Sequence, residues 1–164
     1  MNPMMKLIYE HKEAMLWYDE ESRIIKVEWI GTVDLEAFCA VLLNGGSILN
    51  KTDNAYLLLD RRRFVNFTPE ARIWFKKDFM NRGGSGRRLI RRVRKIAAIK
   101  SSNPLGQVTV SMMAKLLLFF NPYLDYKTFD EEKEANDWVS TIINSRKVMM
   151  PSNKLGWFDR LLGM

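Results

Sequence analysis

Cysteine and histidine are nearly absent from this sequence, which holds one of each, Cys39 and His11, among 164 residues. A single cysteine cannot form an internal disulfide, and its isolation fits a reducing compartment. A zinc site of the Cys/His type would lack ligands. We therefore expect neither a metal nor another cofactor.

Long apolar runs are also missing. The longest extends from Leu116 to Phe120, far below the roughly 20 residues that a helix needs to cross a bilayer. The first residues, MNPMMKLIYEHKEAM, contain neither the long apolar core nor the small-residue cleavage site of a secretory signal. These absences predict a soluble, cytoplasmic protein.

Acidic residues are missing from one long stretch. Arg82–Lys100, RGGSGRRLIRRVRKIAAIK, contains eight basic residues and no acid. The whole chain has 26 Lys and Arg, 19 Asp and Glu, and a net charge of +7. Without this stretch, 18 basic residues would face 19 acidic ones, so the positive charge belongs to one segment.

Apolar and aromatic side chains are plentiful, at 47% and 12% of the residues. A chain of this length and composition fits one globular domain, which can bury about two-thirds of its unfolded surface. We expect a leader at residues 1–13, one domain at residues 14–145 and a short amphipathic tail at residues 146–164.

The first half of the domain predicts a hairpin and a capped helix. Ala14–Asp19 and Arg23–Gly31 flank a polar turn, and the second segment alternates apolar and polar residues as a half-buried strand does. Asp34 predicts a helix start, and Gly45-Gly46 an end or a kink. Helical spacing places one apolar face of this helix at Leu35, Phe38, Cys39 and Leu42. On that face, Cys39 is expected to be inert core packing.

Strands and helices alternate in the second half. The predicted segments are a strand at Ala55–Asp60, a helix that starts at Thr68, Pro69 and Glu70, a strand at Lys95–Ser102, a helix at Pro104–Phe120, a strand at Tyr126–Phe129 and a helix capped by Asp130. The order β-β-α-β-α-β-α-β-α predicts an α/β fold with an open mixed sheet of about five strands, about four helices and right-handed crossovers.

Five short motifs occur in an order that resembles a known fold: VEWIG, LLLD, TPEARIW, KIAAI and FDEEKEANDW. From about Ala14 to Ile143 the chain is similar to the STAS fold of bacterial anti-sigma-factor antagonists, and in particular to the uncharacterised SpoIIAA-like bacterial proteins. The resemblance implies a non-enzymatic domain that works as a binding or regulatory module.

The antagonists of this fold carry a phosphorylatable Ser or Thr directly after the strand-ending Asp, where a helix N-terminus can stabilise a phosphate. Here Asp60 is followed by Arg61, Arg62 and Arg63, and the hydroxyl near the helix start is that of Thr68. A capping Thr uses its oxygen to accept backbone N–H groups. We therefore favour an N-cap over a phosphorylation switch at Thr68.

The arginines are the candidate binding residues. Asp60 and Arg61–Arg63 are predicted at the C-terminal end of a central strand, where open α/β sheets often bind ligands, so an anion held by these guanidiniums is one hypothesis. A second cluster could neutralise the phosphates of nucleic acid or acidic lipid, and consists of Arg87, Arg88, Arg91, Arg92 and Arg94. The alternative for that cluster is a solvated connector that pairs with acids elsewhere.

The remaining sequence features do not predict a catalytic or phosphate-binding site. The glycines of RGGSGRR match neither the P-loop nor the Rossmann spacing, so we expect a flexible connection there. No set of nucleophile, base and orienting group can be assembled, so an enzyme is not predicted. Met112–Phe120 carries more apolar surface than one helix face needs, which favours a homodimer contact or packing of the tail, with lipid contact as an alternative.

Two functions stay open on these grounds. The first is a cytoplasmic protein-interaction or regulatory module that self-associates through apolar helix surface. The second is a domain that binds an anionic partner, such as nucleic acid, a phosphate ligand or acidic lipid, through its arginine clusters.

Overall fold

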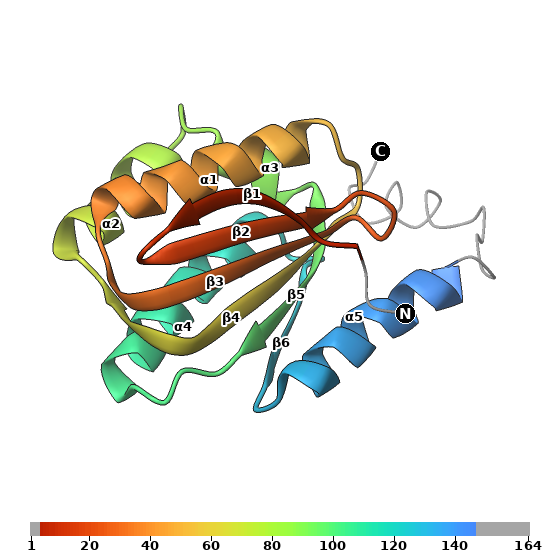
Figure 1. The fold of residues 1–164 in the computed structure, drawn as a ribbon. Coiled ribbons are helices and arrows are strands. Elements are labelled where there is room, and N and C mark those ends of the chain that lie inside the picture. Colours follow the sequence, from red (N-terminus) through yellow and green to blue (C-terminus); the bar gives the residue numbers. More distant parts are fainter. Residues whose placement is uncertain (1–3, 147–164) are drawn as a thin grey trace.

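Six strands form one mixed sheet in the computed structural model, which describes residues 4–146 (Figure 1). In spatial order they are β1 (Lys6–His11), β2 (Ala14–Asp19), β3 (Ile24–Val33), β4 (Ala55–Phe67), β5 (Val93–Ile99) and β6 (Asp125–Phe129). Strands β1, β2 and β3 pair antiparallel, and β3 to β6 pair parallel. The parallel half therefore brings the carboxyl ends of four strands to one edge of the sheet.

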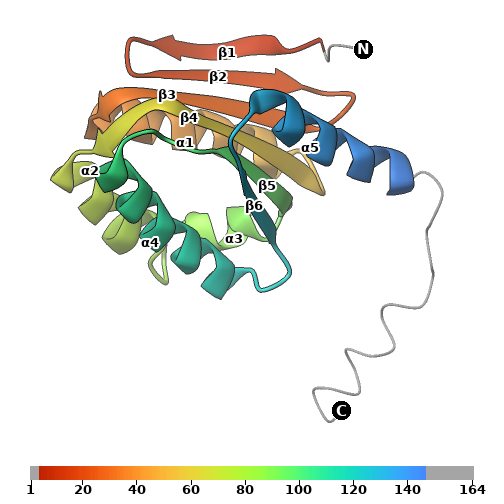
Figure 2. The same ribbon diagram turned by 90° about the horizontal axis from the view of Figure 1, so that it is seen from below.

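Helices cover the two faces of this sheet unequally (Figure 2). One face carries α1 (Leu35–Asn50), α2 (Pro69–Trp74), the π-helical η1 (Phe75–Phe79), α3 (Gly86–Ile90) and α4 (Pro104–Phe120), and the other carries α5 (Glu132–Arg146). The larger core, under the first group, includes Trp29, Phe38, Phe64, Phe67 and Phe75. The smaller core, under α5, includes Tyr56, Leu58, Ala97, Phe129 and Val139.

Two of the three predicted helix caps, Asp34 and Thr68, are in place, whereas α5 begins at Glu132, two residues after the predicted cap Asp130. The Asp34 carboxylate accepts a hydrogen bond from the backbone N–H of Ala37 at 2.9 Å, and the Thr68 hydroxyl oxygen accepts one from Ala71 at 3.4 Å. Each side chain satisfies an N–H group that the first helical turn leaves unpaired. The helix predicted at Pro104–Phe120 has those bounds, and the α/β class is confirmed.

Two strands differ most from the sequence prediction, and a third, β5, covers Val93–Ile99 instead of Lys95–Ser102. Residues 6–11, placed in a leader, form β1 and add a sixth strand at the sheet edge. Strand β4 does not end at Asp60 but continues through the three arginines to Phe67. A bulge accompanies this extension: Glu28 and Ile30 of β3 pair with Asp60 and Arg63, so β4 holds one extra residue.

Helix α1 also departs from its prediction. It continues through Gly45-Gly46 to Asn50, because Gly46 packs closely on Leu89, where a Cβ would come within 3.0 Å of the Leu89 side chain. Its buried residues are Ala37, Phe38, Val41, Gly46 and Leu49. This face is rotated from the predicted one, so Cys39 is half-buried. Burial and the charge of Asp78 raise the pKa of its thiol, which keeps it protonated and unreactive.

The glycines of the basic connector serve close packing. A Cβ on Gly84 would overlap the carbonyl groups of Asp78 and Phe79, and one on Gly86 would overlap the side chains of Phe79 and Met80. The connector thus lies tightly against the end of η1 before α3 begins. The predicted tail from residue 147 onward lies outside the described residues.

Helix α4 approaches β4 so closely that one position tolerates only glycine. A Cβ on Gly106 would lie 2.5 Å from the carbonyl oxygen of Val65 and 3.2 Å from the Phe64 ring. We expect Gly106→Ala to lower the free energy of unfolding by about 1–3 kcal/mol, because helix and strand must move apart. Urea denaturation followed by far-UV circular dichroism measures this change.

Gly45→Ala is the matched control. A Cβ at Gly45 meets nothing within 4 Å, and alanine favours the interior of a helix over glycine by about 0.5–1 kcal/mol. We therefore expect Gly45→Ala to raise the free energy of unfolding. Equal effects of the two substitutions would contradict the close approach of α4 to β4.

Candidate functional site

Strand β4 sends its side chains alternately to the two faces of the sheet. Leu57, Leu59 and Arg61 face the group of helices that includes α1 and α4, whereas Leu58 belongs to the core under α5. Since Asp60 has the parity of Leu58, its carboxylate lies on the α5 side. Consecutive residues of the predicted anion site therefore lie on opposite faces of the sheet.

On the α5 side, Asp60 and Arg62 form a closed ionic network. The Asp60 carboxylate, 3% exposed, accepts hydrogen bonds from the Arg62 backbone N–H at 3.1 Å, from Nε at 3.0 Å and from Nη2 at 2.6 Å. Arg62 Nη2 also donates to Glu132 at 2.7 Å, and Lys26 Nζ donates to the same carboxyl group at 2.8 Å. Two acids balance two bases in this network.

The network keeps both of its carboxyl groups ionised. Burial raises the pKa of Asp60, but the hydrogen bonds from Arg62 and the charges of Arg62 and Lys26 outweigh it, so the pKa lies below its ordinary value. The hydrogen bond from Lys26 is the main cause that lowers the pKa of Glu132. Neither group is therefore poised to exchange a proton near neutral pH.

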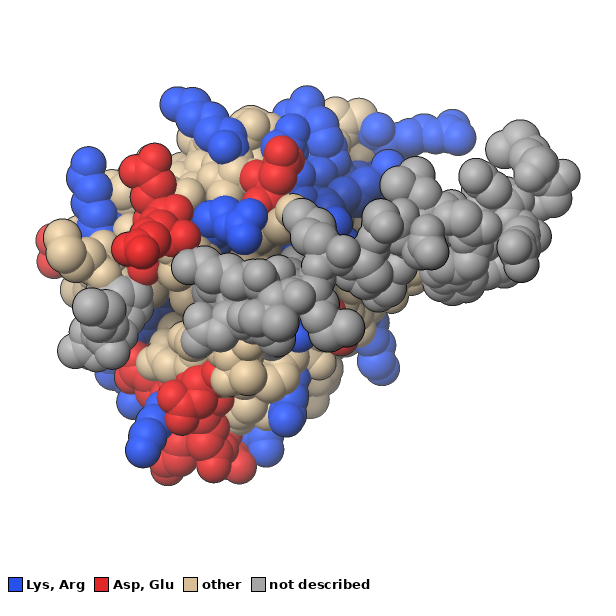
Figure 3. All heavy atoms as spheres, turned by 90° about the vertical axis from the view of Figure 1, so that its right-hand side faces the viewer, with Lys and Arg blue, Asp and Glu red and all other residues tan. Residues whose placement is uncertain are grey.

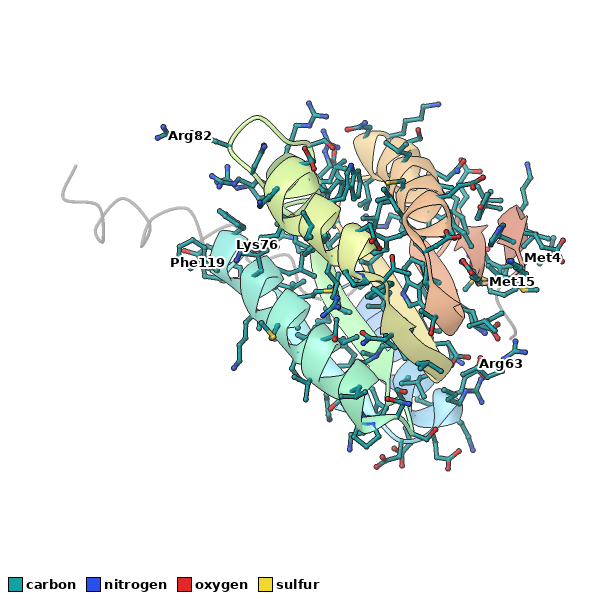
Figure 4. All side chains as sticks on the ribbon, turned by 90° about the vertical axis from the view of Figure 1, so that its left-hand side faces the viewer. Met4, Met15, Arg63, Lys76, Arg82 and Phe119 are labelled. Carbon is teal, nitrogen blue, oxygen red and sulfur yellow. The ribbon has the colours of Figure 1, made fainter. Side chains whose placement is uncertain are left out.

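Arg63 is likewise engaged, because its guanidinium donates to the carboxylate of Glu28. It is exposed and lies at the end of the molecule opposite Arg82, which occupies the loop before α3 (Figure 4). The structure thus does not bring Arg61, Arg62 and Arg63 together around one point. Joint binding of an anion by all three stays a prediction and would require rearranged ion pairs.

Arg61 has a different environment from its neighbours. Its side chain is 2% exposed and lies on the cavity side of the sheet. Among the described residues, no carboxylate is within 4 Å of it, its Nε has no hydrogen-bond partner, and its Nη1 lies 3.5 Å from Gln107 Oε1. Burial lowers the pKa of Arg61, yet a guanidinium stays protonated in proteins. A positive charge is thus buried without a carboxylate partner in the described part of the chain.

Gln107 is held in place from behind. Its Nε2 donates to the backbone carbonyl of Ser101 at 2.9 Å, and the Ser101 hydroxyl donates to the carbonyl of Phe64 at 2.6 Å. These bonds orient the amide so that its oxygen faces Arg61. The closely packed N-terminal end of α4 therefore positions one weak polar contact for the guanidinium.

Arg61 borders a cavity of about 150 Å³ between the sheet and the helices of its larger face. The wall is almost wholly apolar: apart from Arg61, its one other residue with a titratable group is Tyr126. The apolar side chains of the wall come from the sheet and from four helical elements. They include Trp29, Phe38, Leu59, Phe75, Phe79, Leu89, Val110, Met113 and Ala114.

Comparisons with known proteins agree with this architecture. A family model described as SpoIIAA-like matches residues 24–140. The chain belongs to the SpoIIAA-like family. A solved structure, an uncharacterized protein from the DUF3478 family with a SpoIIAA-like fold from Shewanella loihica PV-4, is 18% identical, with a TM-score of 0.53, and the match covers 82% of this chain and 91% of that one. At this identity the likeness concerns the fold alone. A search of curated proteins found no match.

Thr68 of this SpoIIAA-like protein lies in an acidic groove. The groove is lined by Asp34, Glu36, Glu70 and Cys39, besides Leu35. Phosphorylation of Thr68 would remove the hydrogen bond that its oxygen accepts from Ala71. It would also place the phosphate beside three carboxylates, and the repulsion between like charges disfavours this modification. The geometry supports the capping role that we favoured for Thr68.

In the second arginine cluster, Arg87–Arg94, three of the five side chains make contacts within the protein. Arg92 pairs with Asp53 at 3.0 Å, Arg94 donates to Asn54 at 2.5 Å, and the Arg87 guanidinium lies 4.1 Å from the centre of the Phe120 ring. Arg88 and Arg91 are exposed. Figure 3 shows Lys and Arg side chains gathered in the upper right of one face, and Asp and Glu at its upper left and lower edge. Binding of an anionic partner at these arginines stays a prediction.

The apolar surface predicted on α4 is present. Met112 is 67% exposed, and Phe119, 75% exposed, points away from the molecule at the end of the helix (Figure 4). Self-association through Met112–Phe120 stays a prediction. Within residues 4–146, no helix is long and apolar enough to cross a membrane, and no three His, Cys, Asp or Glu side chains gather as metal ligands do.

The buried Asp60 carboxylate yields a stability prediction. Asp60→Asn removes a charge partner of Arg62 and weakens three hydrogen bonds, so we expect the free energy of unfolding at pH 7 to fall by about 2–4 kcal/mol. Because the folded-state pKa of Asp60 is lowered, its contribution is present above the unfolded-state pKa and lost as the pH falls through the folded-state value. The difference from wild type should therefore be constant above about pH 5 and shrink below about pH 4. Urea denaturation between pH 2.5 and 7 measures it.

Asp53→Asn is the control, because the Asp53 side chain pairs with Arg92 while it is 85% exposed. An exposed pair contributes little, so we expect this change to alter the free energy of unfolding by less than about 0.5 kcal/mol. A pH-independent loss in Asp60→Asn would contradict an ionised Asp60 as the source of the stabilisation.

Proposed function

We propose that this protein is a non-enzymatic binding module that takes a small apolar molecule into the cavity between its sheet and the helices α1, η1, α3 and α4. The observation that carries the proposal is the cavity itself, with its volume of about 150 Å³ and its apolar wall. Binding of this kind is what concave, mostly apolar sites with few polar groups do in other proteins.

The size of the cavity argues against an accident of packing. Protein interiors are packed about as densely as organic crystals, and few of their voids exceed a water molecule. A space of about 150 Å³ leaves the side chains around it without packing partners, which lowers stability. Larger side chains at several wall positions would remove that loss. Because the side chains at those positions are small, the wall leaves room for a bound molecule.

The helical wall has features that make room. Gly45 of α1 contributes no side chain, and a Cβ there would meet nothing within 4 Å. On the adjoining side, η1 presents Phe75 and Phe79. Such π-helical turns are rare and are found at functional sites more often than elsewhere. The cavity is therefore framed by a glycine, which leaves the space of a side chain open, and by an irregular turn of helix.

The wall offers little for catalysis. Burial raises the pKa of the Tyr126 phenol, and the charge of Arg61 offsets this only in part. A neutral phenol and a guanidinium supply neither a nucleophile nor a general base near neutral pH. Their presence supports binding, with the chemistry confined to recognition.

A regulatory role fits this proposal. Related antagonists respond to phosphate at a helix N-terminus, but Thr68 is a cap in an acidic groove. Ligand occupancy would instead be the input: an occupant bridges α1, η1 and α4, and thereby stabilises the surface that these helices present to a protein partner. We propose this role within the cytoplasm.

Toluene is a suitable neutral probe because it is apolar and of similar size to the cavity. We expect saturable binding of one toluene, seen as shifts of cavity methyl signals by NMR and as a rise in the melting temperature with toluene concentration. Gly45→Leu should lower the affinity at least tenfold, because its side chain occupies the space beside α1.

Ser47→Leu adds the same side chain to an exposed position of the same helix and should leave toluene binding unchanged. Failure of the wild-type protein to bind toluene, or equal loss in both variants, would refute the proposed function.

A further inference from the structure

We infer that the occupant of the cavity is a small monocarboxylate, whose carboxylate pairs with Arg61 and whose apolar body, of about six carbons, fills the space beside Leu59 and Val110. This inference rests on the proposed function and names the ligand class of the same site. It follows from three properties of the site, namely its charge, its donor geometry and its volume.

The charge of the site is unbalanced. Arg61 is 2% exposed, and no described carboxylate lies within ion-pair distance, whereas Arg62, next in the chain, has two. An ionised group removed from water is strongly destabilising unless it is paired and hydrogen-bonded. Because Asp60 and Glu132 already pair with Arg62 and Lys26 across the sheet, they do not compensate Arg61. An anion in the cavity would.

The donors of the site suit a carboxylate. Arg61 Nη1 is directed to Gln107, while Nε is buried and has no partner. A guanidinium offers parallel N–H donors, which match the two oxygens of a carboxylate. Tyr126 lines the same cavity, and its phenol, protonated at neutral pH, can donate a further hydrogen bond.

The number of charges also selects the ligand. A phosphate dianion would leave one negative charge uncompensated among apolar side chains, because the cavity wall contains a single cationic residue. A monocarboxylate balances Arg61 with no residual charge. The pairing would resemble a buried ion pair that is completed only when the ligand is bound.

The volume limits the apolar part. An engineered cavity of about 150 Å³ in another protein binds benzene, and this cavity has about that volume. A ring or a chain of about six carbons fits such a space, whereas the two acyl chains of a membrane lipid do not. Benzoate and hexanoate are therefore suitable probes of the class.

The test compares benzoate with benzamide, a neutral molecule of nearly the same shape, by isothermal titration calorimetry and NMR. Hydrogen bonds to a charged group contribute about 1.5–3 kcal/mol, so we expect wild type to bind benzoate about 10- to 150-fold more tightly than benzamide. Arg61→Met should abolish that preference while it retains toluene binding. It should also fold with equal or higher stability in the absence of ligand, because it replaces an unpaired buried charge by an apolar group of similar length.

Arg88→Met is the matched control, since it removes an exposed guanidinium and should leave benzoate affinity unchanged within about twofold. Toluene binding without a preference for benzoate, or undiminished benzoate binding by Arg61→Met, would overturn the carboxylate assignment and leave the proposed function standing. Absence of binding by toluene, benzoate and hexanoate alike would overturn both.

Discussion

The buried guanidinium of Arg61 is the feature on which one face of this protein depends, because it is removed from water and has no carboxylate partner. Arg61 reaches that state because β4 continues as a strand past Asp60 and directs alternate residues to opposite faces. Its neighbours Asp60 and Arg62 find partners under α5, so their charges cancel there. The bulge that follows returns Phe64 to the larger core. One strand thus separates a compensated ionic network from an uncompensated charge.

The two faces of the sheet differ because their helices meet it differently. Under α5, small residues such as Ala97 and Ala135 allow close packing, and Lys26 and Arg62 fix the start of the helix through Glu132. On the other face, α4 is drawn tightly onto β4 at Gly106. The aromatic side chains of η1 and the glycines of α1 border the remaining space. Close contact at one end of α4 and open space along its middle together define the cavity.

Local sequence signals predicted most of the elements and little of the site. Caps at Asp34 and Thr68 and apolar alternation in β3 are local effects, and the structure has them where the sequence indicated. Strand β1 was not predicted because an edge strand needs no continuous apolar run, and most of its residues are exposed. Three consecutive arginines resemble the end of a strand, so the extension of β4 was missed. The burial of Arg61 depends on α4 and β6, which lie more than 40 residues away in the chain, and no local pattern encodes it.

The same physics explains why stability alone does not account for this face. An apolar residue at position 61 would satisfy the cavity wall, and bulkier side chains at Gly45 or Ala114 would reduce the void. Each of these substitutions would make the ligand-free protein more stable than it is with the present sequence. Departures from the most stable packing are concentrated in proteins at sites of function. Here an unpaired charge, a void and a π-helical turn all border one space. A single occupant with an acidic head and an apolar body would resolve the charge and the void together.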